Sequence, residues 1–264
     1  MLLDIDASDI SRGAFRVVQT VPLAPGTRRV TMQLPQWLPG NHGPRGTLSE
    51  LADLRFEADG QPVAWTRDPV EVFAFHIDLP EGARQLVARF VHTSPLRSEE
   101  GRIVMTREML NLQWEKMSLY PAGHYVRRIR VKPSVTFPEG WQDAAALDGR
   151  VATGNRVTWA ETDYETLVDS PIFAGRHMQR WNLGRQTMLN VVADSPEQLA
   201  ARNEDMQAFT ALVDESQRLF GRPPFDRYEF LVALTERMGG IGLEHLRSSE
   251  NQLEPKNLIE WKTF

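Results

Sequence analysis

Short alternations of hydrophobic and polar residues, rich in β-branched and aromatic side chains, fill the first part of the chain. Glycine and proline turns separate them, such as APG at 24–26 and DG at 59–60. This spacing is typical of short antiparallel strands. The segments expected to form strands are residues 14–20, 28–34, 70–78, 85–92 and 127–135. We therefore predict a β-rich N-terminal domain, a sandwich or saddle of antiparallel sheets, over residues 1–178.

The hydrophobic pattern changes after residue 184. Residues 186–193 and 228–234 are apolar runs of strand length, and a helical pattern lies between them. This succession of strand, helix and strand differs from the first part of the chain. We therefore predict that residues 179–264 form an α+β segment.

The helical pattern begins with a capping signal at Ser195. Pro196 suits the first helical position, and Gln198 stands where the side chain of a capping box returns to the backbone. Gly221 is suited to end the helix. The hydrophobic residues that share one helical stripe are Leu199, Met206, Phe209, Leu212, Val213, Leu219 and Phe220. The sequence thus predicts one helix between Ser195 and Gly221.

A second helix start lies close to the last residue. Asn257 can cap it, with Glu260 three residues later and hydrophobic residues along one side up to Phe264. Isolated helices shorter than about 12 residues are marginal in water. The pattern indicates an interrupted helix, so we expect the native chain to continue beyond Phe264.

Composition excludes several classes of protein and of site. The 264 residues carry a formal net charge of −5 without a run of like charge, which argues against nucleic-acid binding and a polybasic membrane patch. The absence of cysteine excludes disulfides, thiolate zinc ligands and a cysteine nucleophile. No apolar stretch approaches the roughly 18 residues that a membrane span needs. The acidic start does not resemble a signal peptide, so two locations stay open, the periplasm after signal removal and the cytoplasm.

The motifs of common hydrolases are missing. None of the six histidines belongs to a His-Glu-x-x-His zinc helix, and no phosphate-binding glycine loop, Gly-x-Ser-x-Gly elbow or calcium loop occurs. We therefore assign no catalytic residue and no metal ligand to this chain. Trp37 and Trp114 are expected to be packing residues rather than parts of a substrate cage.

The most unusual segment is MGGIGLEHLRSSEN at residues 238–251. Its glycines allow another backbone to approach closely, and Glu244 and His245 follow where a buried strand would be apolar. An exposed strand edge of this kind can pair with a peptide while Glu244 faces a cationic amine. A glycine turn followed by a solvated charged strand explains the same residues, and spacing alone favours this simpler explanation.

The run GGIGLEHLRSSEN at 239–251 resembles the signature of the glycyl aminopeptidase family, family sixty-one of the metallopeptidases. Further matches follow the family's order; they are LPQWLPGNHGPR at 34–45, MLNLQW at 109–114, LYPAG at 119–123, LVDSPIFAGR at 167–176 and EFLVAL at 229–234. The resemblance implies an N-terminal β domain, then a thermolysin-like zinc domain, and often a PDZ domain. Residues 179–264 would be the first part of the catalytic domain.

The resemblance also implies how a peptide substrate with a free N-terminus would be bound. Glu244 would hold the α-ammonium group, and Gly242 and Leu243 would offer backbone groups to the peptide. His245 would take the position of an asparagine in relatives of the aminopeptidase N type. Independently of the resemblance, residues 247–250 follow this strand closely and are further candidates for shaping the pocket. Such enzymes remove small first residues, of the glycine or alanine type.

The zinc-binding half of such an enzyme is missing from the sequence. In the family, the glutamate strand is followed by a His-Glu-x-x-His helix and a later glutamate ligand, and this chain stops where that helix would begin. Zinc is therefore expected for the intact enzyme, with no ligand in this chain, which alone would be inactive. The alternative hypothesis is a non-catalytic peptide-binding or scaffolding protein derived from the family.

Overall fold

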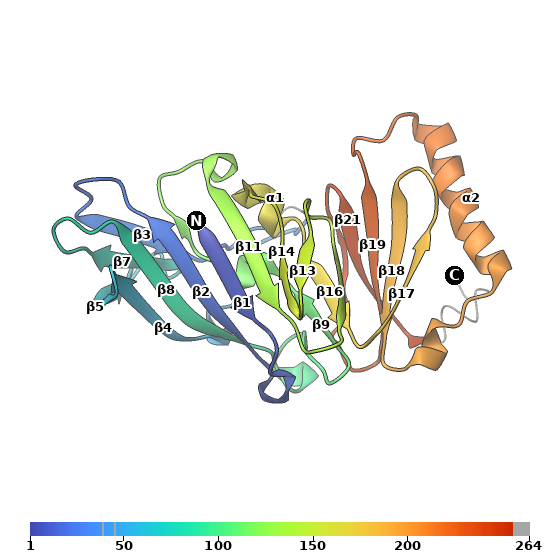
Figure 1. Cartoon of the computed structure of the whole chain (residues 1–264), viewed down its shortest axis with the longest axis horizontal. Coiled ribbons are helices and arrows are strands. Elements are labelled where there is room, and N and C mark those ends of the chain that lie inside the picture. The colour runs from blue at the N-terminus through green and yellow to red at the C-terminus, as the bar shows by residue number, and fades with distance from the viewer. Residues whose placement is uncertain (39, 45, 256–264) are drawn as a thin grey trace. The chain divides into compact units, whose positions relative to one another are not determined.

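The computed structural model describes residues 1–38, 40–44 and 46–255, which form parts of two compact units (Figure 1). The first unit consists of Met1–Ser94, Gln113–Glu139 and Leu147–Asp169. The second unit consists of Pro95–Leu112, Gly140–Ala146 and Ser170–Phe264. The polypeptide thus passes between the units several times, and the domain boundary at residue 178 stays a prediction.

The first unit contains two sheets and one described α-helix, α1 (Tyr164–Val168). Its strands are β1 (Leu2–Asp6), β2 (Ala14–Pro22), β3 (Arg29–Gln33), β4 (Leu51–Ala58), β5 (Gln61–Val63), β6 (Trp65–Arg67), β7 (Ala74–Asp78), β8 (Gln85–Thr93), β10 (Tyr120–Pro121), β11 (Arg130–Thr136), β13 (Val151–Thr153), β14 (Arg156–Thr158) and β15 (Thr162–Asp163). Short 3₁₀ turns lie at Ile10–Arg12, Leu48–Glu50, Trp114–Lys116 and Val126–Arg128. The larger sheet has the order β13-β14-β11-β1-β2-β8-β4-β5, with β15 beside β11, and the smaller has the order β10-β3-β7-β6.

Alternation of buried and more exposed residues is clearest in β2 of the first unit. In β2, every second residue from Phe15 to Val21 is buried, as expected for a strand with one face on a core. Aromatic side chains connect the two sheets, because Phe56 of the larger sheet and Phe75 of the smaller both contact Trp65 edge-on. These three rings therefore form the part of the core that lies between β4 and the β6–β7 pair.

The second unit also contains two sheets, with the helix α2 (Asn203–Phe220). Its strands are β9 (Met109–Leu112), β12 (Gln142–Ala145), β16 (Ile172–Gly175), β17 (His177–Asn182), β18 (Thr187–Ala193), β19 (Tyr228–Leu234), β20 (Gly242–Glu244) and β21 (Ser248–Leu253). Two 3₁₀ turns lie at Ser98–Glu100 and Pro196–Leu199. The smaller sheet has the order β12-β16-β9, and the larger has the order β17-β18-β19-β21-β20. Strands β18, β19 and β21 are parallel, and β17 and β20 close the two edges in antiparallel pairing.

The five-stranded sheet is covered on one face by α2 (Figure 1). The buried residues of that cluster are Leu183, Leu189, Val191, Ala193, Val213, Val232 and Leu234. On the opposite face, the three-stranded sheet supplies Met109, Ala144 and Phe173 to a second cluster with Leu231 and Ala233 of β19. Both faces of the central strands are therefore buried, which explains why most residues of β18 and β19 are apolar.

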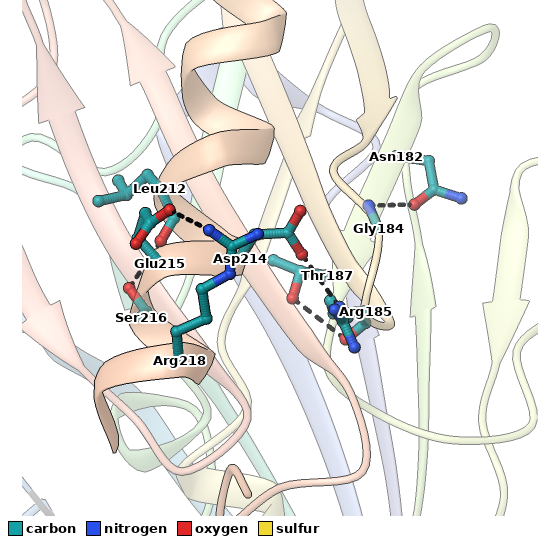
Figure 2. A network of polar contacts seen from close by, with 9 residues as sticks. All are labelled: Asn182, Gly184, Arg185, Thr187, Leu212, Asp214, Glu215, Ser216 and Arg218. Atoms are coloured by element: carbon teal, nitrogen blue, oxygen red, sulfur yellow. Dashed lines mark hydrogen bonds and ion pairs between the residues drawn. The ribbon is translucent and has the colours of Figure 1, made fainter. Parts of the chain in front are cut away.

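The β17–β18 turn is tied to α2 by charged and polar groups (Figure 2). Gly184 takes a left-handed φ of 80°, and its amide donates to the Asn182 side chain at 2.8 Å. Arg185 then reaches Asp214 of α2 at 3.0 Å. The turn conformation thus determines where the guanidinium group meets the helix.

The predicted helix start at Ser195 is real as a cap but not as the start of an α-helix. The Gln198 side chain accepts a hydrogen bond from the Ser195 amide at 3.1 Å. The capped segment Pro196–Leu199 is a 3₁₀ turn, and the chain becomes extended at Ala200, where ψ is 121°. The single helix predicted between Ser195 and Gly221 is therefore wrong at its N-terminal end.

A second cap starts α2. The Arg202 amide donates to the Asp205 side chain at 3.3 Å, and the two side chains form an ion pair at 2.8 Å. Gly221 ends the helix with a φ of 78°, as predicted. Of the predicted hydrophobic stripe, the residues that pack on the sheet are Leu199, Met206, Phe209 and Val213, whereas Leu212, Leu219 and Phe220 are exposed.

The β-rich class predicted from the sequence is confirmed in its coarse form, with several sheets and few helices. The strand predicted at 228–234 matches β19, and that at 186–193 matches β18 within one residue. The strand predicted at 70–78 is shorter, because β7 begins at Ala74. The helix predicted at Asn257 lies outside the described residues. Across the described ranges, no helix is both long and apolar enough to cross a membrane.

Candidate functional site

The predicted site residues lie in a hairpin at one edge of the five-stranded sheet. β20 pairs antiparallel with β21, with Leu243 opposite Glu250. Within the described ranges, β20 pairs with no other strand, so its outer edge is open. Gly242, Leu243 and Glu244 are therefore together on an edge strand, and His245 follows them at the turn.

Alternate residues of β20 direct their backbone groups to the open edge. The His245 amide donates to the Ser248 carbonyl at 2.9 Å, which makes this a hydrogen-bonded pair. Because bonded and non-bonded pairs alternate in an antiparallel ladder, Leu243 bonds to β21, whereas Gly242 and Glu244 turn their N–H and C=O groups outward. A peptide lying beside β20 would meet these outward groups and not those of Leu243.

The side chains of this strand point to opposite faces of the sheet. Leu243 and His245 are buried, whereas Glu244 is exposed and lies on the face that carries α2, beside Ser249 of β21. The Glu244 carboxylate has no hydrogen-bond or ion-pair partner among the described residues. Of the four predicted residues, Glu244 thus offers a charge to a ligand, and His245 is on the buried side.

Two glycines of the segment have different surroundings. A Cβ added to Gly239 would lie 2.6 Å from Cγ and 3.1 Å from Cα of Arg102, so a side chain does not fit there. A Cβ added to Gly242 would meet nothing within 4 Å. Internal packing therefore explains Gly239, and open space remains beside Gly242 at the sheet edge.

Glu250 lies behind the edge strand and is fully buried. Its Oε1 accepts a hydrogen bond from Asn111 Nδ2 at 2.5 Å, and its Oε2 lies 3.3 Å from His245 Nε2. Burial by itself raises the pKa of a carboxyl, but the hydrogen bond and charge of His245, together with Arg102 and Asn111, hold the pKa of Glu250 below its usual range. The contacts of Glu250 thus favour its ionised form.

Glu229 of β19 is a contrasting carboxyl in the same sheet. Its Oε2 accepts a hydrogen bond from Asn190 Nδ2 at 2.8 Å. Burial nevertheless outweighs this bond and the nearby charges of Arg227, Arg180 and Arg247, and raises the pKa of Glu229. Ionisation of Glu229 is thus less favourable in the folded protein than in water.

We expect Glu229→Gln to gain resistance to urea relative to the original protein at about pH 7 and less so at about pH 4. A carboxyl with a raised pKa contributes stability while protonated and loses it as the pH rises through that pKa, whereas glutamine stays neutral. Equilibrium urea unfolding at both pH values measures the two differences. A stability gain over the original protein that is smaller at pH 7 than at pH 4 would contradict this prediction.

The described residues do not form a metal site. Among residues 1–38, 40–44 and 46–255, no group of three or more histidine, aspartate and glutamate side chains is placed to hold an ion. The groups that the hairpin presents to a ligand are the Glu244 carboxylate and the outward backbone groups of Gly242 and Glu244.

Arg102 and Asn111 were not among the residues predicted for this site. Asn111 carried a signal, because it is a polar residue within the apolar run MLNLQW, and it is fully buried. Nothing in the sequence pointed to Arg102, since it follows a charged stretch typical of a surface loop. Of the further candidates at 247–250, Ser249 lies across the ladder from Glu244, and Arg247 pairs with Asp226 at 3.0 Å.

Comparison with known families places the first two thirds of the chain, which does not include the β20 hairpin, in a peptidase family. Residues 2–176, about two thirds of the chain, match the peptidase M61 N-terminal domain. No curated protein gives a significant sequence match to the chain.

The fold is similar to the N-terminal portion of aminopeptidase-family structures. An aminopeptidase N family protein from Idiomarina loihiensis has a TM-score of 0.78 at 16% identity, covering 97% of this chain and 43% of that protein. Native leukotriene A4 hydrolase from Saccharomyces cerevisiae has a TM-score of 0.57 at 12% identity, covering 97% and 40%. The yeast hydrolase in complex with bestatin gives 0.56 at 13% identity, covering 98% and 40%. The chain spans less than half the length of these relatives.

Proposed function

The chain belongs to the peptidase M61 family, whose N-terminal domain it contains, and from this we propose that it is the N-terminal portion of a zinc aminopeptidase. The whole enzyme would remove small first residues, glycine or alanine, from peptides with a free N-terminus. In this proposal, residues 1–178 are the N-terminal β domain. Residues 179–264 begin the catalytic domain and carry the group that holds the substrate's amine.

The observation that supports this proposal most directly is the Glu244 carboxylate at an open sheet edge. Glu244 is exposed, and none of the described residues neutralises it. The neighbouring position, Gly242, leaves space on the same edge. An extended peptide can add to such an edge through its backbone, which places its first residues at a defined distance from the carboxylate.

The same geometry explains selection of a peptide's end. A peptide bonded to the outward groups of Gly242 and Glu244 would bring its α-ammonium group toward the Glu244 side chain, and a charge-assisted hydrogen bond would form. A peptide that continues past this point would place an uncharged amide against the carboxylate and leave the charge unpaired. Such a mismatch lowers affinity, so the edge favours the first residue of a chain.

Zinc is expected for the complete enzyme, but the described residues do not fit a zinc site. In this proposal, the residues described here bind and orient the peptide. Glu244 holds the positive amine, and the β20 edge fixes the direction of the backbone.

Substrate blocking tests the proposal in the protein encoded by the complete gene. We expect kcat/KM for glycyl and alanyl peptides to exceed that of their N-acetylated forms by about 10- to 100-fold, the size of a charge-assisted hydrogen bond. Equal rates for blocked and unblocked peptides would rule out an amine anchor. Binding of unblocked peptides without hydrolysis would instead favour the non-catalytic peptide-binding protein.

A further inference from the structure

The C-terminal end of the Glu244 segment is anchored from behind by a carboxylate. His245 directly follows Glu244, and its side chain is fully buried 3.3 Å from Glu250. Glu250 also accepts the Asn111 side-chain amide at 2.5 Å. The residue next to the exposed Glu244 is therefore held by a buried acceptor that is itself held by another strand.

The N-terminal end of the same segment is anchored by Arg102. Its Nε donates to the Gly239 carbonyl at 3.2 Å, and the Gly239 amide donates to the Ile103 carbonyl at 3.0 Å. The close approach of Arg102 is the reason that position 239 admits no side chain. This end of the segment is thus bound on both of its backbone groups.

Asn111 joins the two anchors into one network. Its Oδ1 accepts a hydrogen bond from Arg102 Nη1 at 2.6 Å, while its Nδ2 donates to Glu250 and to the Ile172 carbonyl at 2.5 and 3.3 Å. Continuous polar contacts therefore run from Gly239 through Arg102, Asn111 and Glu250 to His245. Residues 239–245 are held at both ends by one group of side chains, of which Asn111 and Glu250 are fully buried and Arg102 is partly buried.

Packing alone does not explain a carboxylate at position 250. Its neighbours across the sheet are Leu231 and Leu243, and both are buried and apolar. A hydrophobic residue there would avoid the cost of burying a charge, and buried ion pairs are often no better for stability than such a residue. The described contacts of Glu250 go instead to the groups that hold the glycine-rich edge.

A short edge strand needs such an anchor to be a precise binding surface. β20 has three residues, with glycines before and within it, and it is paired on one side in the described structure. Edge segments of this composition open locally at low free-energy cost. We propose that Glu250 is a positioning residue for peptide binding, which acts through His245 and Asn111 to hold the β20 edge and so fixes the place of Glu244. This inference rests on the proposed aminopeptidase function.

Selectivity measured on the complete gene product tests the positioning role. The readout is the ratio of kcat/KM for an alanyl peptide to that for its N-acetylated form. A variant that folds incompletely loses both rates equally, so this ratio reports only the placement of Glu244. We expect Glu250→Gln to lower the ratio by about tenfold, and Asn111→Leu, which leaves the hairpin sequence intact, to lower it similarly. The matched control Glu229→Gln, on the adjacent strand, should leave it unchanged.

Hydrogen exchange provides a readout that does not depend on activity. In Glu250→Gln, we expect the Leu243 and His245 amides, which bond to β21, to exchange about tenfold faster, while Val232 in the sheet centre keeps its protection. Loss of protection together with a lower ratio supports the proposal. Unchanged protection or an unchanged ratio in a protein that prefers free amines overturns the positioning role alone. If the original protein shows no preference for free amines, the proposed function fails, and the positioning role fails with it.

Discussion

Replacement of Glu244 by alanine in the complete gene product should lower kcat/KM for a free alanyl peptide by about 100-fold, the upper size of a hydrogen bond between charged groups. The carboxylate is exposed in the unliganded edge, but a peptide lying on β20 would remove water from it and strengthen its attraction for the α-ammonium group. The N-acetylated peptide should be hydrolysed at an unchanged rate, since it has no charge to lose. Steady-state kinetics with both peptides measure the two effects.

Two further variants test whether the charge of Glu244, and its position at β20, are required. Glu244→Gln keeps the side-chain length but removes the charge, and we expect it to lose nearly as much as alanine. Glu215→Ala removes another exposed glutamate, from α2, where it pairs with Arg218 at 2.6 Å (Figure 2). Asp214, the residue before Glu215, pairs with Arg185 of the β17–β18 turn. β17 and β20 are the two opposite edge strands of the sheet, so Glu215 is a control away from the β20 edge. Full activity in Glu244→Gln, or a similar loss in Glu215→Ala, would contradict the anchor.

The sequence located the strand of the candidate site, but not its place in the sheet. A strand containing Gly242, Leu243 and Glu244 was expected from the family resemblance, and these residues do form an edge strand. The alternation of side chains in any strand already implies that Leu243 and His245 turn away from Glu244. An exposed strand edge was one hypothesis from the sequence, but the strand order that produces it was not predictable, because β21 lies between β19 and β20 although β20 comes first along the chain.

The network of Arg102, Asn111 and Glu250 could not be predicted from the sequence for a related reason. Asn111 and Glu250 are 139 residues apart, and Arg102 and Gly239 are 137 apart. Local pattern places each residue on a strand or loop but carries no information on which distant segments meet. A polar residue in an apolar strand, as at Asn111, shows that a partner must exist, since buried polar groups are almost always hydrogen-bonded. It does not identify that partner.

The helix error shows the limit of local signals in another way. The cap at Ser195 satisfies backbone groups at a turn start, and this need is the same for a 3₁₀ turn and an α-helix. The sequence pattern therefore located the cap correctly and the element type wrongly. The true start at Asn203 follows a second cap, which uses the side chain of Asp205 and pairs it with Arg202.

Trp37 and Trp114 were both predicted to be packing residues, but they differ in burial. Trp114 is fully buried in the first unit, where its ring meets Trp159 edge-on with centroids 6.1 Å apart. The Ser118 hydroxyl donates to the Trp114 carbonyl at 2.6 Å, which holds the backbone beside the ring. Trp37 lies in a loop rich in glycine and proline and is 63% exposed.

We expect Trp114→Ala to lower the free energy of unfolding of the first unit by about 3–5 kcal/mol, because it removes a large buried ring and leaves a cavity that the surrounding strands cannot fill. Its thermal midpoint, followed by far-ultraviolet circular dichroism, should fall by roughly 10 °C. Trp37→Ala removes the same side chain from a largely solvated position and should change stability by no more than about 0.5 kcal/mol. Equal losses in the two variants would mean that Trp37 is buried in solution. A loss confined to Trp114 would show that its buried ring belongs to the core that stabilises the first unit.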